Sequence, residues 1–94
     1  MKIDKRKLLR RIIRQDLREK ISLEEIRLYL LLIISVDQVN GVGRLSRESL
    51  ERYLGYRLQD KQLEETARTF QRLHLAEIDY SPEKREIGFR LFGQ

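Results

Sequence analysis

Apolar residues are densest between Ser22 and Asp37, where seven of them run consecutively from Leu28 to Ile34. Ser22 is followed three residues later by Glu25, which is the pattern of a capping box at the start of a helix. The predicted helix is apolar on opposite sides, and this indicates burial. The apolar run is far shorter than the ~20 residues that a membrane-spanning helix needs. We therefore expect other segments of the chain to cover this helix on both sides.

Residues 4–20 have the pattern of an amphipathic helix. Its apolar side consists of Leu8, Leu9, Ile12, Ile13 and Leu17. The other side carries a cationic stripe, defined by Lys7, Arg11, Arg14 and Arg18, with Arg6 and Arg10 along its border. Like charges at these spacings repel one another slightly. The stripe fits contact with phosphates, and it fits equally well a solvated outer surface.

Two shorter helices are predicted after a turn that contains Asn40, Gly41 and Gly43. Ser46 is a typical N-cap for a helix over residues 47–54, which Gly55 ends. Asp60 is the expected N-cap of the next helix, residues 61–74. The inward positions of that helix are Leu63, Ala67, Phe70 and Leu73.

The last part of the chain alternates between apolar and polar residues. Ala76, Ile78 and Tyr80 share one face, and so do Ile87, Phe89 and Leu91. Pro82 lies between the two runs and cannot donate to a strand ladder, so the pattern predicts a β-hairpin with a charged loop. Arg44 and Leu45 are expected to add a short third strand.

Composition narrows the possible functions of this 94-residue chain, whose length suits one domain. The absence of Cys excludes disulfides, thiolate zinc sites and a Cys nucleophile, and His74 is the only His. The acidic pairs at residues 24–25 and 64–65 lie on predicted helix surfaces rather than converging on a cleft. We therefore expect no enzyme activity, no metal and no other cofactor. A cytoplasmic protein is expected, because neither a signal peptide nor an apolar span is evident.

Positive charge is concentrated at the N-terminus. Residues 1–20 hold nine Lys or Arg against three Asp or Glu, whereas residues 21–94 hold eleven against twelve. This asymmetry favours a polyanionic or acidic partner at one end of the molecule. Basic amphipathic helices also bind membrane surfaces or calmodulin-type proteins. Because residues 4–20 contain no aromatic anchor, we do not expect membrane binding.

From Ser22 to Phe92, the order of helix, loop, short helix, turn, helix and hairpin resembles the winged helix-turn-helix superfamily. The short helix carries the pattern S-x-E-x-L-x-x-x-L-G, which the chain supplies as Ser46, Glu48, Leu50, Leu54 and Gly55. This pattern looks most like that of prokaryotic regulators and replication-initiator-type modules. The implied fold is mainly α with a small β-hairpin. The resemblance implies a basic N-terminal helix at residues 1–21, followed along the chain by a winged helix-turn-helix domain at residues 22–94.

The resemblance implies that the chain binds double-stranded DNA as a transcriptional regulator or replication-associated factor. In that family the recognition helix, here residues 61–74, enters the major groove, while the wing, here residues 81–85, contacts backbone or minor groove. Transferred by position, the contact residues are Lys61, Gln62, Glu65, Arg68, Thr69, Arg72, Lys84 and Arg85. Asp60, Glu64 and Glu65 make this helix partly acidic, which favours an alternative, a winged helix used for protein–protein contact or dimerisation.

A homodimer is also predicted, through residues 4–20 and the exposed side of the central helix. The apolar side chains there exceed what one small core usually buries: Leu8, Leu9, Ile12, Ile13, Leu17, Leu28, Leu31 and Leu32. The alternative is that residues 4–20 pack over the central helix within one chain.

Overall fold

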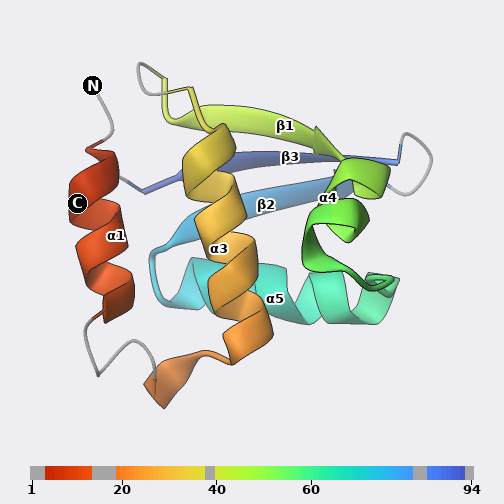
Figure 1. Ribbon diagram of the computed structural model, residues 1–94, viewed down its shortest axis with the longest axis horizontal. Coiled ribbons are helices and arrows are strands. Elements are labelled where there is room, and N and C mark those ends of the chain that lie inside the picture. The colour runs from red at the N-terminus through yellow and green to blue at the C-terminus, as the bar shows by residue number, and fades with distance from the viewer. Residues whose placement is uncertain (1–3, 14–18, 38–39, 82–84, 93–94) are drawn as a thin grey trace.

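The computed structural model describes residues 4–13, 19–37, 40–81 and 85–92. These residues form a small α+β fold of four helices and one three-stranded antiparallel sheet (Figure 1). The helices are α1 (Lys5–Ile13), α3 (Leu23–Ser35), α4 (Arg47–Leu54) and α5 (Asp60–Arg72). The strands are β1 (Val42–Ser46), β2 (Ala76–Ser81) and β3 (Glu86–Leu91). No helix in these ranges is long and apolar enough to cross a membrane.

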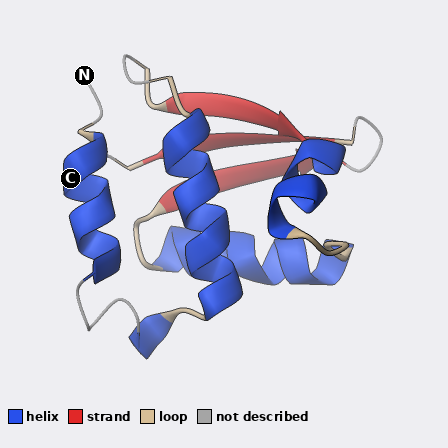
Figure 2. Cartoon of the chain, in the orientation of Figure 1, coloured by secondary structure: helices blue, strands red, loops and turns tan. Residues whose placement is uncertain are grey.

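The sheet has the strand order β1-β3-β2, so the predicted hairpin and the predicted third strand are both confirmed. Phe89 of β3 pairs with Ile78 on one side and Gly43 on the other. Side chains directly opposite one another share a face, and the buried face carries Ile87, Phe89 and Leu91. Figure 2 shows α3 and α4 in front of the sheet and α5 beside β2. The opposite face of the sheet is not packed against α3 or α4.

Helix α3 begins with the predicted capping box. Ser22 Oγ accepts a hydrogen bond from the Glu25 backbone N–H (3.2 Å), and Glu25 Oε1 accepts one from the Ser22 N–H (2.8 Å). Tyr29 is fully buried, and its ring meets Phe70 of α5 edge-on with centroids 5.6 Å apart. Coverage of α3 is incomplete, however, because Leu23 and Ile34 remain 68% and 63% exposed. The residues of the two sides that were expected to be covered are buried or half-buried, so that expectation is confirmed, and a further strip of the helix surface stays exposed.

The predicted helix over residues 4–20 is helical at Lys5–Ile13 and again at residues 19–20, while residues 14–18, with Leu17, lie outside the described ranges. Helix α1 packs against α3 within the chain. The side chains buried around this contact and in the core beneath it are Leu8, Ile12, Leu28, Leu31 and Leu32. These five were among the residues from which the homodimer was predicted. The homodimer stays a prediction, but it needs a surface other than these five side chains.

The bounds of α5 differ from those predicted. The helix begins at Asp60, and Gln59 rather than Asp60 occupies the N-cap position. The Asp60 carboxylate instead accepts hydrogen bonds from other elements. The helix ends at Arg72, and His74 adopts a left-handed φ of 56°, which allows the Leu75 N–H to reach the Phe70 carbonyl (2.8 Å). This is the hydrogen bond of a Schellman ending, in which His74 takes the place that glycine usually fills.

Candidate nucleic-acid interface

The exposed side of α5 carries three of the predicted contact residues. Leu63 and Phe70 are buried, so Lys61, Arg68 and Arg72 lie on the solvent side of the helix. None of these three cations has a hydrogen bond or ion pair from its side chain within the described part of the chain. Glu64, which has the spacing of a helical partner for Arg68, does not pair with it. The three cations are therefore free to meet an anionic ligand.

The other three predicted residues of α5 lie on a different flank. Gln62, Glu65 and Thr69 line a groove that α3 borders with Glu24 and Glu25. Gln62 Oε1 accepts a hydrogen bond from the Gln59 backbone N–H (3.2 Å), and Thr69 Oγ1 donates one to the Glu65 carbonyl (3.0 Å). The side chains of Gln62 and Thr69 are thus hydrogen-bonded to the backbone of α5 and of its N-cap residue. The carboxylates along the groove would repel phosphate. The structure divides the six predicted α5 residues into a cationic side and an acidic groove.

The cationic stripe of α1 is also divided. Lys7 is exposed, whereas Arg14 and Arg18 lie outside the described residues. Arg11 is half-buried, and its Nη1 is buried without a hydrogen-bond partner among the described residues. The Tyr29 hydroxyl is likewise buried and unpartnered; burial raises the pKa of Tyr29, and the nearby Arg11 charge opposes that rise. The prediction that Arg11 shares the solvated side of α1 was therefore wrong, because that flank of α1 turns toward α3.

The cations of α1 and those near the first turn of α5 lie at opposite ends of the molecule. Figure 1 shows α1 at one end of the longest axis, and the start of α5 together with the end of β2 and the start of β3 at the other. Lys7 on α1 is thus remote from Arg85, which precedes β3. Lys84, the other predicted wing residue, lies outside the described ranges.

A cluster around Arg47 connects α4, α5 and the hairpin. Its guanidinium donates hydrogen bonds to Asp60 Oδ1, to the Tyr80 hydroxyl and to the Leu58 carbonyl. The Tyr80 hydroxyl in turn donates to Asp60 Oδ1 (2.9 Å). The hydrogen bonds from Arg47 and then Tyr80 lower the pKa of Asp60, while desolvation and the Asp60 hydrogen bond raise the pKa of Tyr80. The Arg47 backbone N–H also donates to the Arg85 carbonyl (2.9 Å), so the cluster fixes the base of the hairpin.

Sequence reasoning did not identify Arg47, although one signal was present. The first turn of a helix favours acidic residues, because its backbone N–H groups carry partial positive charge. A cation directly after the N-cap Ser46 therefore indicates a partner elsewhere in the fold. That partner proves to be Asp60, 13 residues away.

A hollow beside the Arg47 cluster has two further arginines on its lining, Arg57 and Arg85. Both are exposed, and neither guanidinium has a hydrogen bond or ion pair among the residues that the structure describes. Arg57 belongs to the turn before α5, and Arg85 adopts a left-handed φ of 52° at the hairpin. Only Arg85 was predicted; the signal for Arg57 was its position in the turn of the predicted helix-turn-helix. Two unpaired guanidinium groups at one hollow suit a phosphate, because planar Arg binds its oxygens in a forked geometry.

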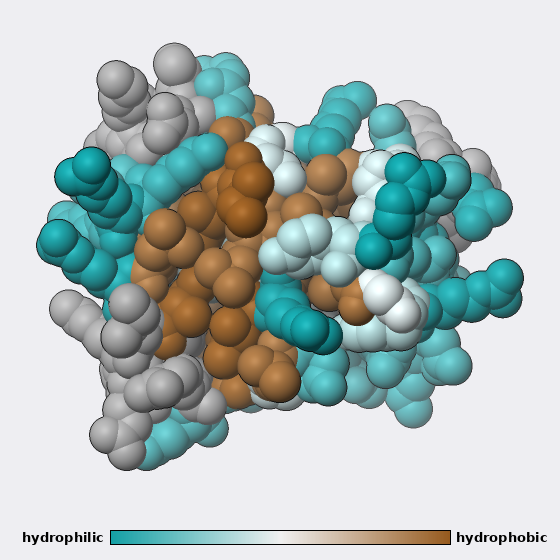
Figure 3. Space-filling model, in the orientation of Figure 1, coloured by the Kyte–Doolittle hydropathy of each residue, from teal (hydrophilic) through white to brown (hydrophobic). Residues whose placement is uncertain are grey.

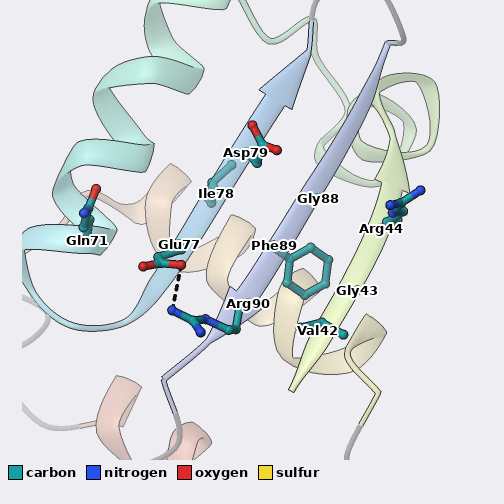
Figure 4. Close-up of a pocket in the computed structure, with 10 residues that line it drawn as sticks. All are labelled: Val42, Gly43, Arg44, Gln71, Glu77, Ile78, Asp79, Gly88, Phe89 and Arg90. Atoms are coloured by element: carbon teal, nitrogen blue, oxygen red, sulfur yellow. Dashed lines mark hydrogen bonds and ion pairs between the residues drawn. The ribbon is translucent and has the colours of Figure 1, made fainter. Parts of the chain in front are cut away.

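A second hollow lies on the face of the sheet away from α3 (Figure 4). Glu77 and Arg90 form an ion pair there (2.8 Å), while Gly88 separates Arg44 from Asp79 on the outer strands. In Figure 4, Arg44 points away from the middle of the sheet. The unpaired charges therefore do not converge on one point, and this hollow presents no assembled site.

The described residues form a small α+β protein with exposed cations on α5 and in the turn before it, none of them paired within the described part of the chain. Comparison of the chain with family models, curated proteins and solved structures finds no match. The function is therefore argued from the residues of this chain alone.

Proposed function

We propose that the chain is a winged helix-turn-helix protein that binds double-stranded DNA, as a transcriptional regulator or replication-associated factor, and that it catalyses no reaction. The order α3, α4, α5 and hairpin supports this assignment, as does β1 pairing with β3. In this assignment α4 and α5 form the helix-turn-helix. Helix α5 is the recognition helix, and residues 81–85 form the wing.

The observation that carries the proposal is the set of cations on and beside α5 that have no ion pair among the described residues. Lys61, Arg68 and Arg72 occupy its solvent side, and Arg57 and Arg85 lie at the hollow near its first turn. Phosphate contacts position a protein on DNA, and base contacts provide specificity. In the proposed mechanism Arg57, Arg72 and Arg85 meet phosphates, and Arg68 reads a base edge from the middle of the helix.

Fluorescence anisotropy with a labelled random-sequence duplex tests this proposal. We expect binding at low salt, with log K falling linearly as log salt rises, by about 0.9 for each phosphate contacted. Charge reversal in an Arg68→Glu/Arg72→Glu variant should abolish binding. Arg52→Glu on α4, a single charge reversal, is the control, because Arg52 already pairs with Glu48 (3.1 Å) and lies outside the proposed interface. Equal binding by both variants would contradict the assignment of α5.

A second function, protein–protein contact through the same domain, is favoured by the acidic groove between α3 and α5. Glu24, Glu25 and Glu65 line it, above a floor that includes Leu28 and Leu54. Carboxylates that flank a DNA-reading helix weaken its contact with phosphates. Absence of DNA binding at low salt would favour this function, and the predicted homodimer would be one form of it.

A further inference from the structure

One strip of α3 faces solvent although it is largely apolar. Leu23, Arg27, Leu30 and Ile34 recur at the spacing that places them on one side of a helix. Leu23, Arg27 and Ile34 are exposed, and Leu30 is half-buried. In Figure 3 an apolar surface covers the region of α3 and continues toward α1.

Helix α1 extends this surface. Lys5 Nζ donates a hydrogen bond to the Ile34 carbonyl (3.3 Å), which fixes Lys5 beside the C-terminal end of α3. Leu9, one turn further along α1, is 38% exposed. We call this surface the α1–α3 patch and define it by Lys5, Leu9, Leu23, Arg27, Leu30 and Ile34. It combines four apolar side chains with two cations.

Acidic residues border the patch but do not neutralise it. The Asp4 carboxylate accepts hydrogen bonds from the backbone N–H groups of residues 6 and 7, so it caps α1. Glu24 lines the groove on the flank of α3 nearer α5. Arg27 has no hydrogen bond or ion pair within the described part of the chain. Among the described residues, the patch therefore offers an apolar surface with an unpaired cation, Arg27, near its centre.

We propose that the α1–α3 patch docks an amphipathic helix of a partner protein, with Leu-type side chains on one face and Asp or Glu beside them. Exposed apolar surface that is continuous along an element is characteristic of interaction sites. An amphipathic helix anchors its apolar side chains one or two turns apart, which is the spacing of Leu23, Leu30 and Ile34. Its carboxylates would pair with Arg27 and Lys5, and this charge complementarity selects an acidic helix over a basic one.

A second copy of the chain fits this patch less well. A twofold axis centred on the strip between Leu23 and Ile34 would pass close to Arg27. The two symmetry-related Arg27 side chains would then face each other, with no carboxylate of the patch between them. Like charges brought together at an interface oppose association. The patch is thus complementary to an acidic partner and not to itself.

The test uses the full chain and a designed, fluorescein-labelled helical peptide of about 15 residues, with Leu on one face and Glu elsewhere. Anisotropy titration should show saturable binding of this peptide. A peptide of the same composition in permuted order, and one with Lys in place of Glu, should bind at least about tenfold more weakly. Arg27→Glu and Ile34→Asp should each weaken binding of the acidic peptide by roughly tenfold or more. Tyr53→Asp, which places the same charge on an exposed side chain of α4, should leave binding unchanged.

Circular dichroism of each variant verifies that it is folded, and the DNA titration described above is repeated with Ile34→Asp. Ile34→Asp should bind DNA as the wild type does. Loss of peptide binding with unchanged DNA binding shows that the patch acts independently of the proposed DNA interface. Equal binding of the acidic and permuted peptides would overturn the inference, as would undiminished binding by the folded Arg27→Glu and Ile34→Asp variants. A wild-type dimer in sedimentation that Ile34→Asp converts to a monomer would assign the patch to a second copy, and would also overturn it.

Discussion

Tyr29 is fully buried where α3 meets α5, and its hydroxyl has no hydrogen-bond partner in the part of the chain that the structure describes. An unsatisfied buried hydroxyl contributes no favourable bond and retains its cost of desolvation. We therefore predict that Tyr29→Phe leaves the free energy of unfolding unchanged or raises it by up to ~1 kcal/mol. Tyr29→Ala, which also removes the ring contact with Phe70, should lower it by roughly 3–5 kcal/mol. Urea denaturation measures both variants, and a clear loss of stability in Tyr29→Phe would show that the hydroxyl makes a stabilising interaction and contradict this prediction.

Asp60 links the Arg47 cluster to the pH dependence of stability. Its folded pKa lies below the usual value, first because of Arg47 and then because of Tyr80. A carboxyl with a lowered folded pKa stabilises the fold above the unfolded pKa of about 3.9, and this stabilisation is lost as pH falls through the folded pKa. We predict that Asp60→Asn is less stable than wild type at pH 7 and loses less stability on acidification.

Urea denaturation at pH 7 and at pH values below the unfolded pKa of Asp tests this prediction. Asp79→Asn is the matched control, because Asp79 is exposed and its carboxylate has no ion pair or hydrogen bond among the described residues. The free energy of unfolding of this control should change with pH as that of the wild type does. If that of Asp60→Asn does so as well, the Arg47 cluster does not depend on a charged Asp60.

At the scale of elements, the sequence predicted what local pattern determines. The capping box of α3, the Gly55 ending of α4 and the alternation in β2 and β3 depend on residues near one another in the chain, and all are confirmed. Asp60 was assigned to the N-cap because Asp is a common capping residue. Its carboxylate is used instead by Arg47, 13 residues away, and by Tyr80, 20 residues away. Periodicity carries no information about such long-range partners.

For the candidate site too, the sequence predicted which residues face solvent but not which neighbours they contact. The inward residues Leu63 and Phe70 correctly placed Lys61, Arg68 and Arg72 toward solvent. Periodicity did not reveal which neighbour each flank of a helix faces. Arg11 turns toward α3, and Gln62 bonds to the backbone of Gln59, because the packing of α1 and the capping of α5 decide those orientations.

On α5, Arg68 and Arg72 are predicted to differ in role. Arg68 lies near the middle of the helix, where its planar group can donate to both O6 and N7 of a guanine. Arg72 is the last residue of the helix, a position suited to a phosphate. On the preferred duplex, Arg68→Ala should cost roughly 1–3 kcal/mol of binding free energy and relax preference at one base pair. Arg72→Ala should weaken binding to all sequences about equally.

Binding of each variant to a selected duplex and to random duplexes measures this difference. Glu64→Ala is the control, because Glu64 forms no ion pair with Arg68 within the described chain, and its removal should not alter preference. An equal loss on both duplexes by Arg68→Ala would make Arg68 a phosphate contact. No loss on either duplex would favour the protein-contact function.

At the scale of the whole molecule, the net charge of +5 does not form one continuous surface. The cations of α1 lie at one end of the longest axis, and those of the hollow beside the Arg47 cluster lie near the other (Figure 1). Between them α3 presents the α1–α3 patch, and the groove beside α5 is acidic. A duplex that contacts α5 and the hairpin is therefore expected to leave α1 and the patch free for a second partner.

The salt dependence of DNA binding distinguishes the two cationic ends. Arg57 and Arg85 line the hollow near α5 and have no ion pair within the described ranges. An Arg57→Ala/Arg85→Ala variant should therefore reduce the slope of log K against log salt by nearly two, about 0.9 for each lost phosphate contact. Lys7→Ala/Arg10→Ala removes the same charge from exposed positions on α1 and serves as the control. Its slope should equal that of the wild type, because α1 lies at the other end of the molecule. If the α1 variant reduces the slope as much as the hollow variant does, DNA must contact both ends, and α1 would then belong to the interface.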